Sequence, residues 1–224
     1  MMKSKNAFTL AEVLITLGII GVVATLTLPN VMANYAKKSQ VAQLQRSVNA
    51  VSSAMGNYLL DKKTDNFADT NFAADPSEFF TDYLGGTYLG TYWGTAMNDV
   101  FKKNYKKVSN PSTEYTFDQV VSNSSGYGFF DKDYACGKLV TGATVCMSKY
   151  PNYDWTGGNY VAAIDVNSDA GPNIIGRDLF MMDFTKKGRV TVQSGWTYGY
   201  EYCHQGSEYA CFTKIMLDGW EMNY

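Results

Sequence analysis

The first apolar run of the chain predicts a membrane-spanning helix. Residues Phe8–Leu28 read FTLAEVLITLGIIGVVATLTL, in which Glu12 is the only charge. As an α-helix, this run of 21 residues rises about 31 Å, which matches the hydrocarbon core of a bilayer. A short basic segment with Lys3 and Lys5 precedes it. Pro29 follows it and predicts a kink or a local unwinding of the helix.

Beyond the proline, the pattern changes to one apolar stripe on an otherwise polar helix. The stripe recurs at spacings of three and four residues and consists of Val41, Leu44, Val48, Val51, Met55 and Tyr58. A stripe of this kind can be a coiled-coil seam, but this one persists for under three heptads. We therefore predict a helix that packs on the sheet of its own domain.

From about residue 61, the pattern predicts a loop and short strands. A short helix is expected near Pro76–Leu84, and the segment Gly85–Gly94, rich in glycine and aromatics, is expected to run irregularly over the surface. The strand candidates are Glu114–Val121, Gly126–Phe130, Leu139–Lys149, Asn159–Val166, Leu179–Phe184 and Arg189–Gln193. The last two flank Thr185–Gly188, a hairpin signal with glycine where φ is positive.

These elements predict an α+β fold. A long N-terminal helix, with a membrane-spanning half and an amphipathic half, is expected to pack on an antiparallel β-sheet.

Composition excludes several functional classes. Charged residues make up 18% of the chain and aromatics 15%, which is too apolar for a disordered chain. The net charge is -2 without a long basic run, so nucleic acid is not expected as a partner by default. His204 is the single histidine, and the chain contains no G-x-S-x-G, no H-E-x-x-H and no phosphate-binding glycine loop. We therefore expect no enzyme.

The four cysteines form two close pairs, Cys136/Cys146 and Cys203/Cys211. Neither pair has the two-residue spacing of a redox motif or a zinc knuckle. Beside a membrane-directing segment, the favoured interpretation is two structural disulfides in an oxidising compartment. The sequential connectivity is favoured because each pair closes a small loop, which is worth roughly 2–3 kcal/mol. Four reduced, buried thiols are the alternative.

The stretch after residue 164 contains a candidate metal site. Asp165, Asn167 and Asp169 alternate, so in a turn their oxygens can converge on a hard cation such as Ca²⁺. The terminal bidentate Glu of an EF-hand loop is missing. The preferred alternative is an Asx-rich connection, in which these side chains bond their own backbone and Gly171-Pro172 makes the turn.

Glu12 raises a question of charge balance. A charge inside the hydrocarbon costs about 3 kcal/mol on insertion scales and usually has a partner. No other residue of the apolar run carries a charge, so a charged partner comes from outside the helix or from processing. A cut between Ala7 and Phe8 would create an α-amino group about one helical turn from Glu12. Between staggered helices, the two groups could pair directly and set the register of an assembly.

The segment KNAFTLAEVLITLGIIG resembles the class III signal of type IV pilins and type II secretion pseudopilins. The resemblance implies that a prepilin peptidase cuts between Ala7 and Phe8, that Phe8 is N-methylated, and that Glu12 is the assembly carboxylate. Pro29 falls where that family often has a helix-weakening proline. The family usually has Gly before the cut, so Ala7 puts the efficiency of cleavage in question. A secretory signal peptide fits poorly, because no small-x-small site ends the apolar run; a plain signal anchor is the alternative.

The resemblance also implies an organisation and a function. The expected segments are a leader at 1–7, a transmembrane assembly helix at 8–28, an amphipathic stem helix at 29–60 and a globular α+β domain at 61–224. The expected function is a structural subunit that polymerises into a type IV pilus or a type II secretion pseudopilus. Its partners are a prepilin peptidase, other pilin or pseudopilin subunits and an assembly platform. The location is the bacterial inner membrane, in a single pass, with the globular domain in the periplasm or outside the cell.

A second function uses the exposed aromatics expected on the surface. A membrane-anchored binding module, an adhesin or a DNA-uptake minor pilin, would bind through aromatic loops such as Tyr88–Trp93 or Trp196–Tyr202.

Overall fold

The computed structural model describes residues 9–101, 104–122, 133–151, 158–168, 170–191, 203 and 208–224. The predicted strand Gly126–Phe130 and the predicted loop Trp196–Tyr202 lie outside these residues. The chain divides into two units, Met1–Ser39 and Gln40–Tyr224. One helix, α1 (Leu10–Asp61), runs from the first unit into the second.

In the first unit, α1 exposes its apolar side chains, which lack a covering layer in the part of the chain that the structure describes. The hydroxyls of Thr16, Thr25 and Thr27 donate to backbone carbonyls three or four residues earlier, so the helix satisfies its own polar groups. Pro29 lies inside α1, and the helix continues through it, so of the predicted kink or local unwinding the structure excludes the unwinding.

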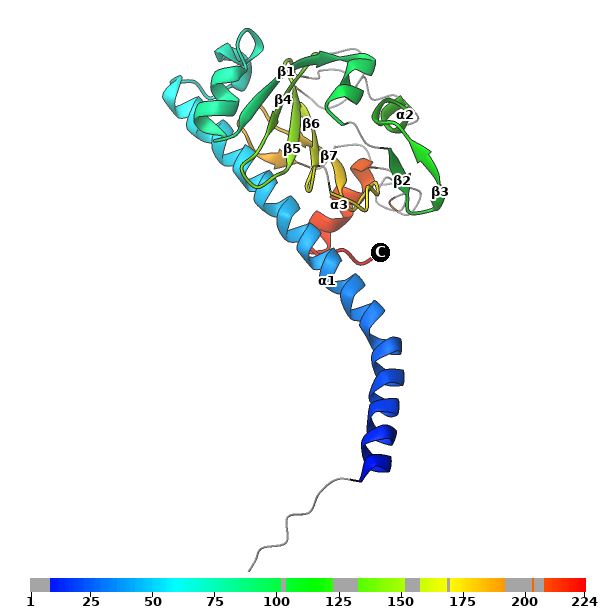
Figure 1. The fold of residues 1–224 in the computed structure, drawn as a ribbon. Coiled ribbons are helices and arrows are strands. Elements are labelled where there is room, and N and C mark those ends of the chain that lie inside the picture. The colour runs from blue at the N-terminus through cyan, green and yellow to red at the C-terminus, as the bar shows by residue number, and fades with distance from the viewer. Residues whose placement is uncertain are drawn as a thin grey trace, which may run out of the picture. The chain divides into compact units, whose positions relative to one another are not determined.

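The second unit contains one large sheet and one small sheet (Figure 1). The large sheet is antiparallel, in the order β1 (Thr87–Trp93), β4 (Asp133–Lys138), β5 (Thr144–Ser148), β6 (Tyr160–Asp165), β7 (Leu179–Phe184) and β8 (Val190–Thr191). The small sheet pairs β2 (Tyr105–Lys107) with β3 (Asn110–Tyr115). The helices are η1 (Phe67–Asp69), η2 (Asn71–Ala73), the π-helical η3 (Phe79–Tyr83), η4 (Gly94–Asp99), α2 (Phe117–Ser122) and α3 (Glu208–Leu217).

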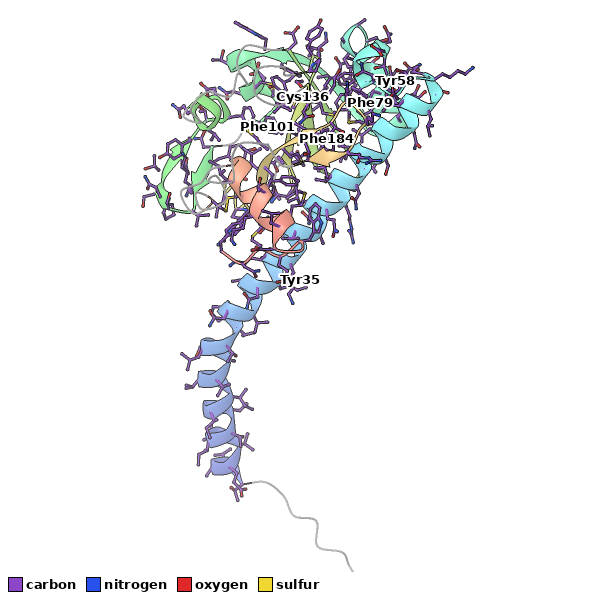
Figure 2. All side chains as sticks on the ribbon, turned by 180° about the vertical axis from the view of Figure 1, so that it is seen from behind. Tyr35, Tyr58, Phe79, Phe101, Cys136 and Phe184 are labelled. Atoms are coloured by element: carbon purple, nitrogen blue, oxygen red, sulfur yellow. A yellow bond between two sulfur atoms is a disulfide. The ribbon has the colours of Figure 1, made fainter. Side chains whose placement is uncertain are left out.

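One face of the large sheet packs against the C-terminal half of α1 (Figure 1). We call this layer the helix-side core. Its α1 side chains are the predicted stripe, each at most 6% exposed, and its sheet side chains include Ala162, Ile164, Phe180, Met182 and Phe184. In Figure 2, Tyr58 and Phe79 mark this layer, and their rings lie 5.7 Å apart. The predicted packing of the stripe on the sheet, and the α+β fold, are confirmed.

The opposite face of the sheet is also covered, by a second core. Its members include Met97, Phe101, Tyr105, Phe117, Val161, Ala163, Leu179 and Met181. Figure 2 shows Phe101 of this layer. Because both faces are buried, all six residues of β6 and of β7 are buried, and these strands read as near-continuous apolar runs. The predicted strands Asn159–Val166 and Leu179–Phe184 are confirmed.

The hairpin after β7 also follows its signal. Gly188 N–H donates to the Thr185 carbonyl over 2.8 Å, and Gly188 has a φ of +77°. The strand that follows is short, since β8 covers two residues of the predicted Arg189–Gln193.

Three predictions along the domain are wrong. The segment Gly85–Gly94 contains the strand β1, in which Gly90, at φ +135°, lies at a bulge. The candidate Glu114–Val121 is a strand only to Tyr115, because α2 starts after Thr116. The Thr116 N–H donates to Gln119 Oε1 over 3.1 Å, which is one of the two bonds of a capping box.

The third concerns the candidate Leu139–Lys149. Its first five residues form a turn, in which Leu139 N–H donates to the Ala143 carbonyl, and only Thr144–Ser148 is a strand. The strand before the turn, β4, lies outside every candidate.

Candidate functional site

The start of α1 is a capping box between Thr9 and Glu12. The Thr9 backbone N–H and the Thr9 hydroxyl each donate to Glu12 Oε2 over 2.8 Å. In return, the Glu12 N–H donates to Thr9 Oγ1 over 3.3 Å. Thr9 therefore occupies the N-cap and Glu12 the third helical position, the arrangement that satisfies the otherwise unbonded N–H groups of the first turn.

Glu12 has a local hydrogen-bond partner that charge balance alone does not predict. A cation was expected as its partner, whereas the structure supplies neutral donors from Thr9 within the same turn. The pattern T-x-x-E is a recognisable signal for such a cap. Among the residues that the structure describes, both bonds fall on Oε2, and Oε1 accepts none. The carboxylate therefore has one oxygen left for a further donor. Ala7 and Phe8 lie outside the described residues.

The helix beyond Glu12 has the properties of a membrane anchor. Within the described ranges, α1 is the one helix long and apolar enough to cross a bilayer, and its apolar window has no buried part. Glycines lie on this segment at Gly18 and Gly21, and an added Cβ at either would meet nothing within 4 Å. Small residues of this kind allow the backbones of neighbouring helices to approach closely.

The cysteines are joined in sequence order. Cys136 and Cys146 are direct partners across β4 and β5, with an S–S distance of 2.05 Å. Cys203 is joined to Cys211, which lies on α3. All four residues are fully buried, so these sulfurs have a structural position rather than an accessible one.

The C-terminal disulfide is covered by the turn that precedes β7. A Cβ at Gly176 would overlap with Cys211 Sγ, so only glycine fits there. The Tyr224 hydroxyl donates to the Gly176 carbonyl and fastens the end of the chain over the same turn.

Of the candidate calcium residues, the structure describes Asp165 and Asn167. Asp165 is 1% exposed, and its Oδ2 accepts from the Tyr105 hydroxyl over 2.6 Å. Its Oδ1 accepts from the backbone N–H groups of Ser168, over 2.8 Å, and Asn167, over 3.2 Å. This is the Asx arrangement. The Asn167 amide donates to the Gly171 carbonyl, and Asp169 lies outside the described residues.

Two further buried carboxylates were not expected from the sequence. Asp178 is fully buried; its Oδ1 accepts from the Gln40 amide over 2.8 Å and its Oδ2 from the Ile174 N–H over 3.1 Å. Asp183 is 1% exposed, and burial raises its pKa to about 7. Within the described ranges, no group of three His, Cys, Asp or Glu side chains is placed to hold a metal ion. Burial of this kind depends on tertiary packing and has no local sequence signal.

Of the two aromatic segments that were proposed to bind a ligand, the structure describes one. Tyr88–Trp93 lies within the edge strand β1 of the large sheet, where Leu89 is 41% and Trp93 62% exposed. Trp196–Tyr202 and His204 lie outside the described residues.

Comparison with known proteins identifies the first segment of the chain. The family model for the prokaryotic N-terminal methylation motif matches residues 2–28. No curated protein and no solved structure matches the chain. The match includes Ala7, Phe8 and Glu12, and it confirms the type IV pilin or pseudopilin signal that the sequence predicted.

Proposed function

We propose that this chain, whose first 28 residues carry the N-terminal methylation signal of pilins and pseudopilins, is a structural subunit of a type IV pilus or a type II secretion pseudopilus. The observation that carries the proposal is the methylation motif, with Glu12 as the single charge of the exposed apolar segment Leu10–Leu28 of α1. The motif indicates a structural subunit rather than an enzyme. The leader is 1–7, and the globular domain at 61–224 is completed by the stem helix.

Processing supplies the cation that Glu12 lacks. A prepilin peptidase cuts between Ala7 and Phe8, and the new Phe8 amine is methylated. Glu12 Oε2 accepts from Thr9, which leaves Oε1 for a donor outside the capping box. A neighbouring subunit provides that donor through its own Phe8 amine, which fixes the register between the two helices. Gly18 and Gly21 support close packing of these helices.

The location follows from the same features. The apolar half of α1 anchors the chain in the bacterial inner membrane before assembly, where an assembly platform and sibling subunits receive it. The domain lies in the periplasm or outside the cell, since two buried disulfides form in an oxidising compartment.

The N-terminal residue of the membrane-extracted protein tests processing. Mass spectrometry is expected to find N-methyl-Phe8. An intact Met1 or a cut after Leu28 would contradict the proposal. The variant Ala7→Gly is the matched control for the cut site, and it is expected to be processed at least as completely as the wild type.

The role of Glu12 is tested by filament incorporation in a mixed wild-type background. Glu12→Ala removes the charge and the cap, whereas Glu12→Gln removes the charge but keeps a capping-box side chain. Both variants are expected to be cleaved normally and to stay out of filaments. Incorporation of Glu12→Gln at the wild-type level would show that the charge makes no assembly contact.

A second candidate function is the anchored binding module. The exposed Trp93 and Leu89 on β1 support it, because an exposed aromatic suits stacking on sugars or on single-stranded nucleic acid. Trp93→Ala is then expected to abolish surface adhesion or DNA uptake while its incorporation into filaments stays unchanged.

A further inference from the structure

The segment between the predicted membrane helix and the domain has no covering layer in the described structure. Burial of α1 begins only at Gln40, yet Val31 is 61%, Met32 67% and Tyr35 76% exposed. Apolar side chains at this density need a nonpolar environment. The helix also continues through Pro29, so the proline does not end the membrane segment.

Charge along α1 locates the two ends of the membrane segment. The stretch Val13–Ala36 carries no charge, and it rises about 36 Å as an α-helix. The hydrocarbon core is about 30 Å thick, so the stretch crosses it with room to tilt. Glu12 then lies at one boundary of the core, and Lys37 and Lys38 lie beyond the other. At the boundary, the free-energy cost of placing the Glu12 charge in the membrane is also lower than in the middle of the hydrocarbon core.

The far boundary has the composition of a membrane interface. Tyr35, labelled in Figure 2, is the aromatic residue of this segment, and it precedes two cations. Lys38 is exposed and Lys37 is half-buried. The only acids of α1 are Glu12 and Asp61, which lie far along the helix on either side. A tyrosine followed by cations is typical of the level of the lipid headgroups.

We propose that the bilayer extends along α1 to Tyr35, and that the exposed Lys38 binds the phosphate groups of anionic phospholipids at the outer face. The proposal rests on the proposed membrane anchoring of the unassembled subunit. It places the boundary of the membrane about two helical turns beyond Leu28.

Accessibility of single introduced cysteines tests the boundary. The full processed chain is reconstituted in vesicles at a low protein-to-lipid ratio and treated with a membrane-impermeant maleimide. Leu28→Cys and Met32→Cys are expected to be protected, and Lys38→Cys and Ala42→Cys to react. Reaction of Met32→Cys as fast as Ala42→Cys overturns the proposal.

A further position separates failure of this inference from failure of the proposed function. Ile20→Cys lies inside the charge-free stretch, two turns from its N-terminal end. If Ile20→Cys reacts, the chain does not span the bilayer and membrane anchoring itself fails. If Met32→Cys is protected only at a high protein-to-lipid ratio, a second copy rather than lipid covers this face, and the lipid assignment is overturned.

Headgroup binding is tested by native mass spectrometry of the chain released from vesicles of phosphatidylglycerol and phosphatidylcholine. Each basic residue near an anionic surface contributes about fivefold in affinity, so Lys38→Gln is expected to retain phosphatidylglycerol about fivefold less. Arg46→Gln removes an exposed cation farther along α1 and is expected to bind as the wild type does. Equal retention of both lipids by the wild type, or an equal loss in Arg46→Gln, overturns the assignment.

Discussion

Asp183 is a buried acid on β7, with its side chain toward the second core. Val161 on β6 lies directly opposite Asp183. The Val161 N–H donates to the hydroxyl of Ser148 on β5. Burial raises the pKa of Asp183 to about 7, although the Asn159 side chain opposes the shift. The folded domain therefore favours the neutral acid.

This raised pKa predicts a pH-dependent stability. The pKa rises from the ordinary 3.8 to about 7 in the folded state, so the stabilising effect is fully present below about pH 4 and is lost as the pH rises through 7. The free energy of unfolding is expected to fall by on the order of 4 kcal/mol across that window. Denaturant titrations from pH 4 to pH 8 measure the slope. Asp183→Asn is expected to flatten it, and an unchanged slope in this variant would contradict the assignment.

The turn at Asp165 is where the sequence predicted a calcium site, with Asp165, Asn167 and Asp169 as ligands. Because hydrogen bonds from Tyr105, Asn167 and Ser168 already occupy the Asp165 carboxylate, the melting temperature is expected to be the same with calcium and with a chelator. Differential scanning fluorimetry measures it. A drop of several degrees on chelation would instead establish a bound cation.

The same turn predicts a structural role for the carboxylate. Asp165→Ala leaves the buried Tyr105 hydroxyl without this acceptor, so the loss of stability is expected to be about 1–3 kcal/mol. Tyr105→Phe/Asp165→Ala removes both partners and is expected to recover part of that loss. Equal stability of Asp165→Ala and the wild type would show that the bond contributes nothing.

At the scale of elements, the hairpin between β7 and β8 rests directly on α1. A Cβ at Gly188 would lie 2.7 Å from the Met55 Cβ, and the Ser52 hydroxyl donates to the Gly188 carbonyl. Gly188 thus answers two requirements, a positive φ and a close approach to the helix.

A pair of glycine variants separates these requirements. Gly142 has a φ of +92° and no atom within 4 Å of an added Cβ. Gly142→Ala is expected to lose about 1 kcal/mol through backbone strain alone. Gly188→Ala is expected to lose a further 1–3 kcal/mol, approximately, because the added methyl forces α1 and the hairpin apart. Urea unfolding compares the two variants, and equal losses would mean that the helix accommodates the methyl.

Sequence patterns predicted the elements whose burial follows a simple period. The α1 stripe and the strands β6 and β7 are examples, since their side chains face cores on regular positions. The pattern failed where turn chemistry overrides local propensity. The strand β1 contains Gly90 and follows Gly86, and these glycines indicate a loop by composition. Gly86 nevertheless lies against the Lys138 carbonyl, where an added Cβ would come within 2.6 Å of the oxygen. Thr116 starts a helix inside an apparent strand.

The candidate functional site also has features that could be predicted from the sequence and features that could not. Glu12 was predictable, because a charge in an apolar run is conspicuous at the level of composition. Its bond to Thr9 depends on capping geometry that the T-x-x-E pattern contains but that a charge balance ignores. Asp183 was not predictable, since its burial comes from two layers packed on one sheet and not from its neighbours in the chain.

At the scale of the whole molecule, the two disulfides lie in different parts of the domain. Cys136–Cys146 lies within the second core between two strands, and Cys203–Cys211 fastens α3, which packs on β7. Both close loops of similar length, with sequence separations of 10 and 8. Their entropic contributions to stability are therefore similar.

Pairwise removal of the cysteines tests this expectation. Cys136→Ala/Cys146→Ala and Cys203→Ala/Cys211→Ala are each expected to lose roughly 2–3 kcal/mol. Urea unfolding under oxidising conditions measures both, and the reduced wild type serves as the reference for losing the two bonds together. Wild-type stability in either double variant would mean that the bond forms after folding without stabilising the domain.

The continuity of α1 from an exposed apolar segment into the helix-side core has a mechanical consequence. A subunit held at its N-terminal end and pulled at its domain carries the tension along a single helical backbone into Gln40–Leu59. There the load meets side-chain packing, since the buried stripe holds α1 to the sheet by apolar contact. Such an arrangement yields by shear along a whole row of contacts at once. Resistance to pulling in this protein therefore resides in the stem helix, and substitutions that thin the stripe would weaken the molecule under load before they weaken it at rest.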